Sequence, residues 1–177
     1  ALLTFYAGYL SPESYRFVDK MVDRLNRNLS DLRADMAPGW EEGRFGQLWE
    51  QGEDGLKRYN AMNKVEPMQK AMTSVGAGTW YSGLRRSQSE SRATRKILEF
   101  QGGRVKFHPI VDWSNRDVHV YLKDHDLPYH PLWEQGYVSV GDTHTTRKLE
   151  DGMREEDTRF FGQGRECGLH LSEGRMP

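Results

Sequence analysis

The strongest constraint on the fold is the order of apolar segments at the start of the chain. Residues 1–5 are apolar and β-prone, which is typical of a buried strand. Ser11 and Pro12 suit the cap and first turn of a helix, whose apolar residues recur at three- and four-residue spacing as far as Leu25. A second strand is expected at residues 29–32. This strand–helix–strand order predicts an α/β fold with a parallel twisted sheet and flanking helices.

The same reasoning predicts further elements along the chain. Strands are expected at residues 79–82 and 105–111, where apolar and β-branched residues are bounded by polar or glycine residues. A helix is expected over residues 64–72. Another helix should begin after Ser114, with Asp117 completing a capping box.

Composition limits the class of protein. The chain has 177 residues, enough for one domain or most of one. Its 25 basic and 26 acidic residues give a net charge of −1, so no overall field favours nucleic acid or a membrane surface. No apolar run reaches the roughly 20 residues of a membrane span, and no signal-peptide pattern is seen at the start. Hydrophobic residues make up 36%, which fits either a fragment that lacks a buried piece or a subunit that completes its core in an oligomer.

Cys167 is the only cysteine and lies in a polar, glycine-containing segment near the C-terminus. A single thiol forms no intramolecular disulfide and no cysteine-based metal site. It is therefore a buried spectator, a surface accident or a nucleophile on a terminal arm. One unpaired thiol also fits a reducing cytosol. No histidine or cysteine spacing typical of a metal site occurs, so no metal is predicted.

A polar loop after the strand at residues 79–82 is the second chemical feature. Guanidinium groups and hydroxyls in this loop suit the oxygens of a phosphate or sulfate, and the carboxyl end of a parallel strand is the usual ligand edge. The alternative is a solvated basic loop. The candidate residues are Gly83, Arg85, Arg86, Ser89, Ser91 and Arg92. A hydroxyl-rich loop at residues 136–147 offers His144 and Arg147 as a second wall. Spacing alone makes Lys64 a solvated residue at a helix start.

Five segments in order resemble the assimilatory phosphoadenylyl-sulfate (PAPS) reductase family. They are Lys-Val-Glu-Pro at 64–67, the loop at 83–92, Pro-Tyr-His-Pro-Leu-Trp at 128–133, the loop at 136–146 and Glu-Cys-Gly-Leu-His at 166–170. The resemblance covers roughly residues 9–170. It implies an ATP-pyrophosphatase-like (adenine nucleotide alpha hydrolase-like) fold and a cytoplasmic homodimer. It also implies release of sulfite and adenosine 3′,5′-bisphosphate, with thioredoxin or glutaredoxin as reductant.

The resemblance implies a mechanism that agrees with the residue chemistry. The Cys167 thiolate would attack the sulfonate sulfur, and a thioredoxin thiolate would then release sulfite from the covalent intermediate. Cations must surround the sulfonate oxygens. The first candidates are Lys64, Arg85, Arg86 and Arg92, and the second are His144 and Arg147. Arg165 is suited to hold Cys167 ionised, although Glu166 opposes that effect.

The adenylyl-sulfate reductases form a related type that carries an iron–sulfur cluster. That cluster needs additional cysteines, including an adjacent pair, and this chain has a single cysteine. The sequence therefore predicts no iron–sulfur cluster and no other bound cofactor, and it favours a substrate that carries a 3′-phosphate.

The chain departs from the family pattern at its start. Relatives carry a further strand and a serine- and glycine-rich phosphate loop before the segment that matches Leu2 and Leu3. Residues 1–158 are therefore expected to form a nucleotide-binding α/β domain with its N-terminal part absent, and residues 159–177 to form an arm with the catalytic cysteine. Where relatives have Asp-Thr-Gly-Tyr, only Gly8 and Tyr9 match. The alternative to an active reductase is a non-catalytic remnant that binds an adenine nucleotide or thioredoxin.

Overall fold

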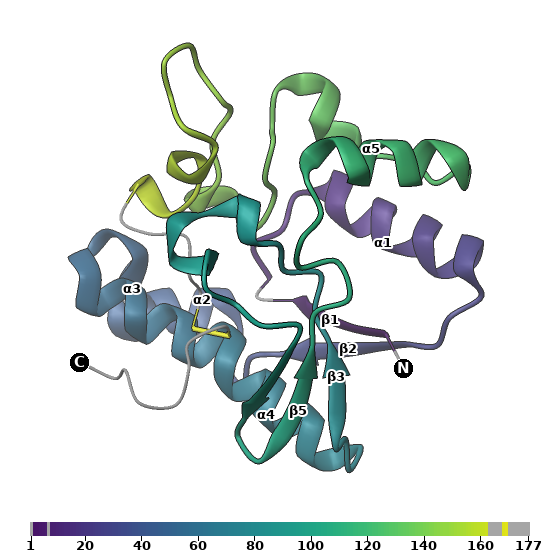
Figure 1. Ribbon diagram of the computed structural model, residues 1–177. Helices are drawn as coiled ribbons and strands as arrows, with labels where there is room; N and C mark the ends of the chain where they lie inside the picture. Colours follow the sequence, from purple (N-terminus) through teal and green to yellow (C-terminus); the bar gives the residue numbers. More distant parts are fainter. Residues whose placement is uncertain (1, 7, 163–167, 170–177) are drawn as a thin grey trace. The chain divides into compact units, whose positions relative to one another are not determined.

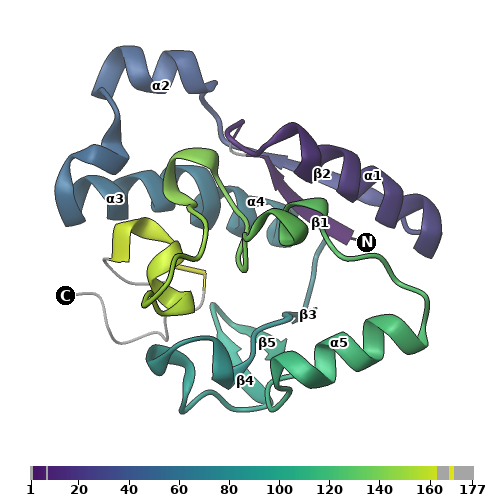
Figure 2. The same cartoon turned by 90° about the horizontal axis from the view of Figure 1, so that it is seen from above.

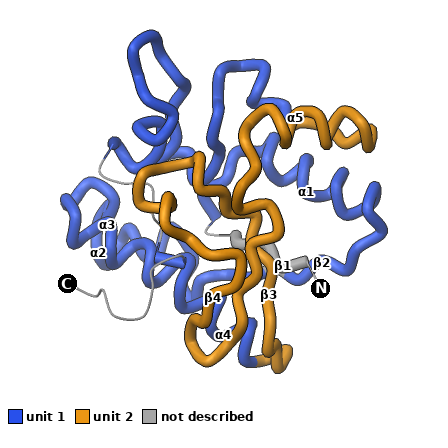
Figure 3. Tube along the Cα trace, viewed as in Figure 1, with its two compact units in different colours: residues 1–73, 130–170 blue, residues 74–129, 171–177 orange. Residues whose placement is uncertain are grey.

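The computed structural model describes residues 2–6, 8–162 and 168–169. These residues group into two compact units. The first unit contains the chain up to Thr73 together with the described residues from His130 onward, and the second contains residues 74–129 (Figure 3). Helices and strands of both units are labelled in Figure 1.

The first unit begins with the predicted strand–helix–strand segment. Strands β1 (Leu2–Tyr6) and β2 (Leu29–Arg33) pair in parallel, each residue of one opposite the equivalent residue of the other. Helix α1 (Pro12–Leu25) connects them and runs alongside the pair (Figure 2). The Ser11 hydroxyl accepts a hydrogen bond from the Ser14 N–H at 3.3 Å, so the predicted cap is confirmed.

Helices make up the next part of the first unit. Helix α2 (Pro38–Phe45) is followed by α3 (Gly52–Asn60), and a π-helical turn (Ala61–Val65) joins α3 directly to α4 (Glu66–Ser74). The helix predicted over residues 64–72 therefore belongs to a longer helical segment.

The π turn lies directly before a proline. Pro67 lacks an N–H and cannot donate to the carbonyl four residues earlier, that of Asn63. The N–H of Glu66 donates to the carbonyl of Ala61, the five-residue spacing of a π turn. The turn widens the helix at Asn63 and Lys64, both of which are buried.

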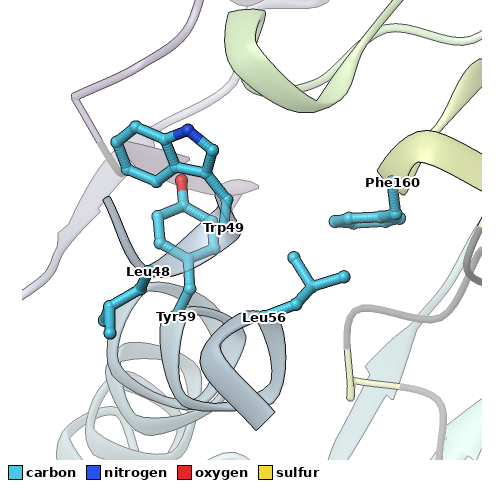
Figure 4. Packing of buried hydrophobic residues seen from close by; sticks show 5 residues of the cluster. All are labelled: Leu48, Trp49, Leu56, Tyr59 and Phe160. Atoms are coloured by element: carbon cyan, nitrogen blue, oxygen red, sulfur yellow. The ribbon is translucent and has the colours of Figure 1, made fainter. Parts of the chain in front are cut away.

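The core of the first unit is a cluster of aromatic and leucine side chains. Its members are Leu48, Trp49, Leu56, Tyr59 and Phe160 (Figure 4). Tyr59 is fully buried, and its ring meets that of Trp49 edge-on with centroids 5.5 Å apart. Tyr9, Phe45 and Met62 pack against the cluster from its margin.

The second unit is built on a three-stranded sheet in the order β3–β5–β4. Strand β3 (Thr79–Tyr81) pairs in parallel with β5 (Arg104–Phe107), as expected for an α/β chain. Strand β4 (Leu98–Gln101) forms an antiparallel hairpin with β5 through a turn at Gly102 and Gly103, whose φ angles are both positive. Strand β5 ends earlier than the predicted residue 111.

This sheet has one polar and one apolar face. On the polar face Lys106 is fully buried, and its ammonium lies 3.0 Å from Gln101 Oε1 and 4.5 Å from the Trp80 ring centroid. On the other face Tyr81 and Phe100 are 72% and 80% exposed.

Helix α5 (Asn115–Asp124) follows the sheet. The Asp117 N–H donates to Ser114 Oγ at 3.2 Å, and Asp117 Oδ2 accepts from the Ser114 N–H at 2.8 Å. The predicted capping box is therefore confirmed.

Short 3-10 turns complete the described chain. They are Leu48–Glu50, Arg86–Gln88, Glu90–Arg92, Pro131–Gln135, Thr143–Thr145, Glu155–Thr158 and Phe160–Gly162. Among the described residues, no helix combines the length and apolar character needed to cross a membrane.

Candidate active site

The residues predicted to bind the substrate fall in both units. The first unit contains Lys64, His144 and Arg147, and the second contains Gly83, Arg85, Arg86, Ser89, Ser91 and Arg92. Cys167 and Arg165 lie outside the described residues.

The arginine loop, residues 83–92, leaves the sheet of the second unit directly after β3. The Ser82 N–H donates to the Phe107 carbonyl at 2.9 Å, which extends the pairing of β3 and β5 to the start of the loop. The Arg86 N–H donates to the Val111 carbonyl at 2.8 Å. The loop therefore starts at the carboxyl end of a parallel strand, where α/β proteins bind ligands.

Arg85 and Arg86 have different surroundings. Arg85 Nη1 donates to Asn115 Oδ1 at 2.9 Å and to the Trp113 carbonyl at 3.5 Å. Arg86 forms an ion pair with Asp112, and its Nε donates to the Arg95 carbonyl at 2.7 Å. Arg86 thus tethers the loop to two neighbouring segments, whereas Arg85 contacts the start of α5.

Gln88 organises the remaining candidates of the arginine loop. Its side-chain oxygen accepts from the Arg85 N–H at 3.1 Å and from the guanidinium of Arg92. Arg92 is 8% exposed. The hydroxyls of Ser89 and Ser91 lie 2.9 Å apart. The loop is therefore held in shape by its own side chains, which pre-arranges its donors.

Lys64 is buried and held by the π turn and by a distant loop. Its ammonium lies 2.7 Å from Asp142 Oδ2 and 3.1 Å from Asn60 Oδ1. It also lies over the rings of Tyr59 and Phe160, at 5.3 and 4.9 Å from their centroids. A buried ammonium requires such partners, so Lys64 is not the solvated residue that its spacing alone favoured.

Asp142 is the buried counter-charge of Lys64, with 3% of its surface exposed. Burial alone would raise the pKa of Asp142, but the Lys64 ammonium, with help from Arg159, holds that pKa below its usual value. The adjoining backbone is fixed by Thr143, whose N–H donates to the Tyr9 carbonyl at 2.8 Å. Asp142 therefore remains a carboxylate near neutral pH.

His144 is enclosed by aromatic rings. It stacks on Trp49 with centroids 3.7 Å apart and planes at 25°, and it meets Tyr9 and Tyr59 edge-on. Burial lowers the pKa of His144 to about 4, so the imidazole is neutral at pH 7. Its Nε2 is buried and has no hydrogen-bond partner among the described residues.

Arg147 lies on the exposed surface of the same unit. Its Nε donates to the Asp157 carbonyl at 3.0 Å, and its backbone N–H donates to the Thr158 carbonyl at 3.0 Å. These contacts join the loop that contains Arg147 to residues 157–158. The anion-binding role of Arg147 stays a prediction.

Gly168 lies against the π turn. Its φ is +86°, a left-handed conformation that favours glycine. A Cβ added at Gly168 would lie 2.9 Å from Val65 Cγ2, so only glycine fits against this side chain without a shift. Gly168 follows Cys167 in the sequence, and Val65 follows Lys64.

Sequence reasoning missed the partners of the predicted cations. Asn60 precedes Lys64 by one helical turn, a spacing that could have indicated a contact. Asp142 lay in a segment that carried the family resemblance, but its pairing with Lys64 depends on tertiary structure. Arg159 was also missed as a charged neighbour of Asp142. Within the described part of the chain, no group of three or more histidine, cysteine or acidic side chains could hold a metal ion.

Solved structures define the class of fold. Candida glabrata FMN adenylyltransferase in complex with FMN and an ATP analogue superposes with a TM-score of 0.59, at 10% identity over 93% of this chain and 52% of that one. A phosphate complex of PAPS reductase from Candida auris superposes with a TM-score of 0.70, at 26% identity over 82% of this chain and 70% of that one. The chain therefore has an adenine nucleotide alpha hydrolase-like α/β fold, which confirms the predicted fold class.

The family follows from sequence comparison. Residues 2–148 match the phosphoadenosine phosphosulfate reductase domain, and the chain belongs to this family. Proteins named phosphoadenosine 5′-phosphosulfate reductase from Alkalilimnicola ehrlichii and Zymomonas mobilis are 62% and 61% identical to it, each over 92% of this chain. The alignments cover 66% and 67% of those relatives, so the chain spans about two thirds of their length. The resemblance to the family is thus confirmed.

Proposed function

We propose that the chain forms the catalytic part of a PAPS reductase of sulfate assimilation. It would reduce 3′-phosphoadenylyl sulfate to sulfite and adenosine 3′,5′-bisphosphate through an S-sulfocysteine intermediate resolved by thioredoxin. The observation that carries this proposal is the 62% identity, over 92% of the chain, to a relative named phosphoadenosine 5′-phosphosulfate reductase.

The proposed chemistry proceeds in two thiol steps. The Cys167 thiolate attacks the sulfonate sulfur, an S–S bond forms, and the S–O bond to the nucleotide breaks with adenosine 3′,5′-bisphosphate as leaving group. A thioredoxin thiolate then attacks Cys167 Sγ, and sulfite leaves with the electron pair of the S–S bond. The second thioredoxin thiol resolves the mixed disulfide, so thioredoxin supplies both electrons and Cys167 is regenerated.

The arginine loop supports the nucleotide-binding part of the proposal. Its position after β3 and its internal hydrogen bonds suit it to receive phosphate oxygens. Arg85 is the first candidate because its guanidinium donates to the amide oxygen of Asn115, a neutral acceptor that an anion can displace. Arg86 would act by holding the loop.

The π turn supports the assignment of the reacting group. Lys64 supplies a buried ammonium there, and Gly168 contacts the next residue, Val65. The residue before Gly168 is Cys167, the only thiol of the chain. Lys64 is proposed to meet the sulfonate oxygens, and neutral His144 could donate a hydrogen bond to them.

Further features of the proposal come from the family resemblance. They are a cytoplasmic location, a homodimer, thioredoxin or glutaredoxin as the external reductant, and no resident cofactor or iron–sulfur cluster. The single cysteine supports the last of these, since a cluster is ligated by several thiolates.

Sulfite release tests the proposed function. The protein should release sulfite from PAPS only when reduced thioredoxin is present, and Cys167→Ser should abolish release while nucleotide binding persists. If the wild-type protein binds PAPS but releases no sulfite with thioredoxin or glutaredoxin, the non-catalytic alternative replaces the proposal.

A further inference from the structure

The Lys64–Asp142 ion pair places a buried carboxylate beside a cation proposed to meet the substrate. We propose that Asp142 determines specificity: it fixes Lys64 and makes this site favour a terminal sulfonate over a terminal phosphate of the same shape. The inference rests on the proposed function, because it takes Lys64 to contact the transferable group of the nucleotide.

Distances and burial make the pair a fixed unit. Lys64 Nζ lies 2.7 Å from Asp142 Oδ2, and the side chains are 11% and 4% exposed. Asn60 Oδ1 accepts a further hydrogen bond from the ammonium at 3.1 Å. With two positions of the ammonium occupied, an anion that approaches Lys64 also approaches the carboxylate of Asp142.

Neighbouring side chains keep water away from the Lys64–Asp142 pair, so the charge of the Asp142 carboxylate is weakly screened. Phe160 and Tyr59 cover the ammonium with their rings. Arg159 is the second cation near Asp142; its Nε donates to the Thr145 carbonyl at 3.3 Å. Further titratable groups among the described residues of this part include Tyr9, Glu41, Glu42, Tyr59 and His144, and Arg58 lies near Glu41.

The two candidate terminal groups differ in charge and hardly in shape. The terminal sulfonate of PAPS, joined to the phosphate by an anhydride oxygen, carries one negative charge at any pH of interest. A terminal phosphate carries about 1.5 to 2 negative charges at pH 7, because its second pKa is near 6. Shape cannot separate the two, but a nearby carboxylate disfavours the extra charge. Two unit charges a few ångströms apart near a protein surface interact strongly enough to change affinity by about tenfold or more.

Asp142, His144, Tyr9 and Tyr59 keep their charge between pH 5.5 and 8. The Lys64 ammonium keeps the pKa of Asp142 below its usual value despite burial, and burial lowers that of His144 to about 4. Burial raises the pKa of Tyr59 and of Tyr9 above their usual range. Burial also raises the pKa of Glu41, but that carboxyl is retained when Asp142 is replaced. The comparison of Asp142→Asn with the reference protein therefore separates the effect of Asp142 from that of Glu41.

The experiment compares two nucleotides in calorimetric titrations. PAPS is compared with 3′-phosphoadenosine 5′-diphosphate, which has a phosphoryl group in place of the sulfonate. All proteins carry Cys167→Ser so that PAPS stays intact. The ratio of the two dissociation constants is measured at pH 5.5 and 8 for the otherwise wild-type protein, for Asp142→Asn and for the control Glu150→Gln, which removes the same charge from an exposed position.

We expect the preference for PAPS in the reference protein and in Glu150→Gln to be several-fold larger at pH 8 than at pH 5.5. Asp142→Asn should reduce the preference at pH 8 by about tenfold. An Asp142→Asn protein that binds PAPS with an unchanged preference overturns the inference. If this variant does not fold, a preference that is independent of pH in the reference protein overturns it equally. If PAPS does not bind at all, the proposed function itself fails.

Discussion

Asn63 Nδ2 lies 2.9 Å from both carboxylate oxygens of Glu41. The two residues are 2% and 1% exposed, so the π turn and α2 are joined by a buried contact between an amide and a carboxyl group. Burial raises the pKa of Glu41, and the hydrogen bonds from Asn63 oppose that rise. This contact fixes the turn that carries Lys64.

Asn63→Ala should lower the free energy of unfolding by about 2–3 kcal/mol at pH 8, because it leaves a buried carboxylate without its donor. A carboxyl group whose folded pKa is raised destabilises the fold as pH rises, so the loss should be smaller at pH 5 than at pH 8. Urea unfolding of the wild-type protein and of Asn63→Ala at both pH values measures this loss of unfolding free energy. The exposed control Asn28→Ala should cost less than about 0.5 kcal/mol. An equal loss at both pH values would show that Glu41 is not involved.

His144 should make stability depend on pH. Burial lowers its folded pKa to about 4 from the ordinary 6.5, so the unfolded chain binds more protons between these values. The contribution of neutral, buried His144 to the free energy of unfolding is present in full above pH 6.5. It is lost as pH falls toward 4. His144→Phe keeps a ring against Trp49 and should reduce the slope of unfolding free energy against pH in that interval. An NMR titration midpoint near 6.5 for His144 would contradict the expected burial effect.

Local signals in the sequence located the helix starts correctly. Ser11 with Pro12, and Ser114 with Asp117, act through hydrogen bonds within one turn, so their effect does not depend on the rest of the fold. The hairpin of β4 and β5 was missed, although the glycine pair at 102 and 103 is a recognised hairpin signal.

Tertiary structure decided what the sequence left open. Lysine is seldom fully buried unless its ammonium has a partner. Lys106 is fully buried because its ammonium donates a hydrogen bond to Gln101 on the neighbouring strand. Likewise, Lys64 was selected from the family resemblance, but its pairing with Asp142 joins segments far apart in the sequence. No local pattern encodes such a pair, so the sequence could name candidate cations but not the counter-charges beside them.

Arg85 and Arg86 should respond differently to removal of the guanidinium. Arg85→Ala should weaken PAPS binding by about 1.5–3 kcal/mol, the range for a hydrogen bond to a charged group, with little change in stability. Arg86→Ala should lower stability by about 1 kcal/mol, because it releases Asp112 and the Arg95 carbonyl. Calorimetric binding and urea unfolding on both variants measure the contrast. Equal effects of the two variants on binding and stability would contradict this division of roles.

Gly168→Ala should slow sulfonate transfer and leave PAPS affinity nearly unchanged. The added Cβ would lie 2.9 Å from Val65 Cγ2, so residue 168 or the Val65 side chain must shift. Single-turnover formation of the Cys167 adduct measures the rate, which should fall about tenfold if the shift costs about 1.4 kcal/mol in the transition state.

The double variant Gly168→Ala with Val65→Ala provides the control. It removes the collision and should recover part of the rate, while the strain of a positive φ remains. A normal rate in Gly168→Ala alone would show that this contact is not needed for transfer.

The proposed function depends on transfer of the sulfonate from the nucleotide to Cys167. Intact-mass analysis and peptide mapping, after PAPS is mixed with the protein in the absence of thioredoxin, detect this transfer. We expect one added sulfonate on the peptide that contains Cys167, none in Cys167→Ser, and loss of the adduct as sulfite when reduced thioredoxin is added. A folded protein with nucleotide bound and an unmodified Cys167 would show that the transfer does not occur.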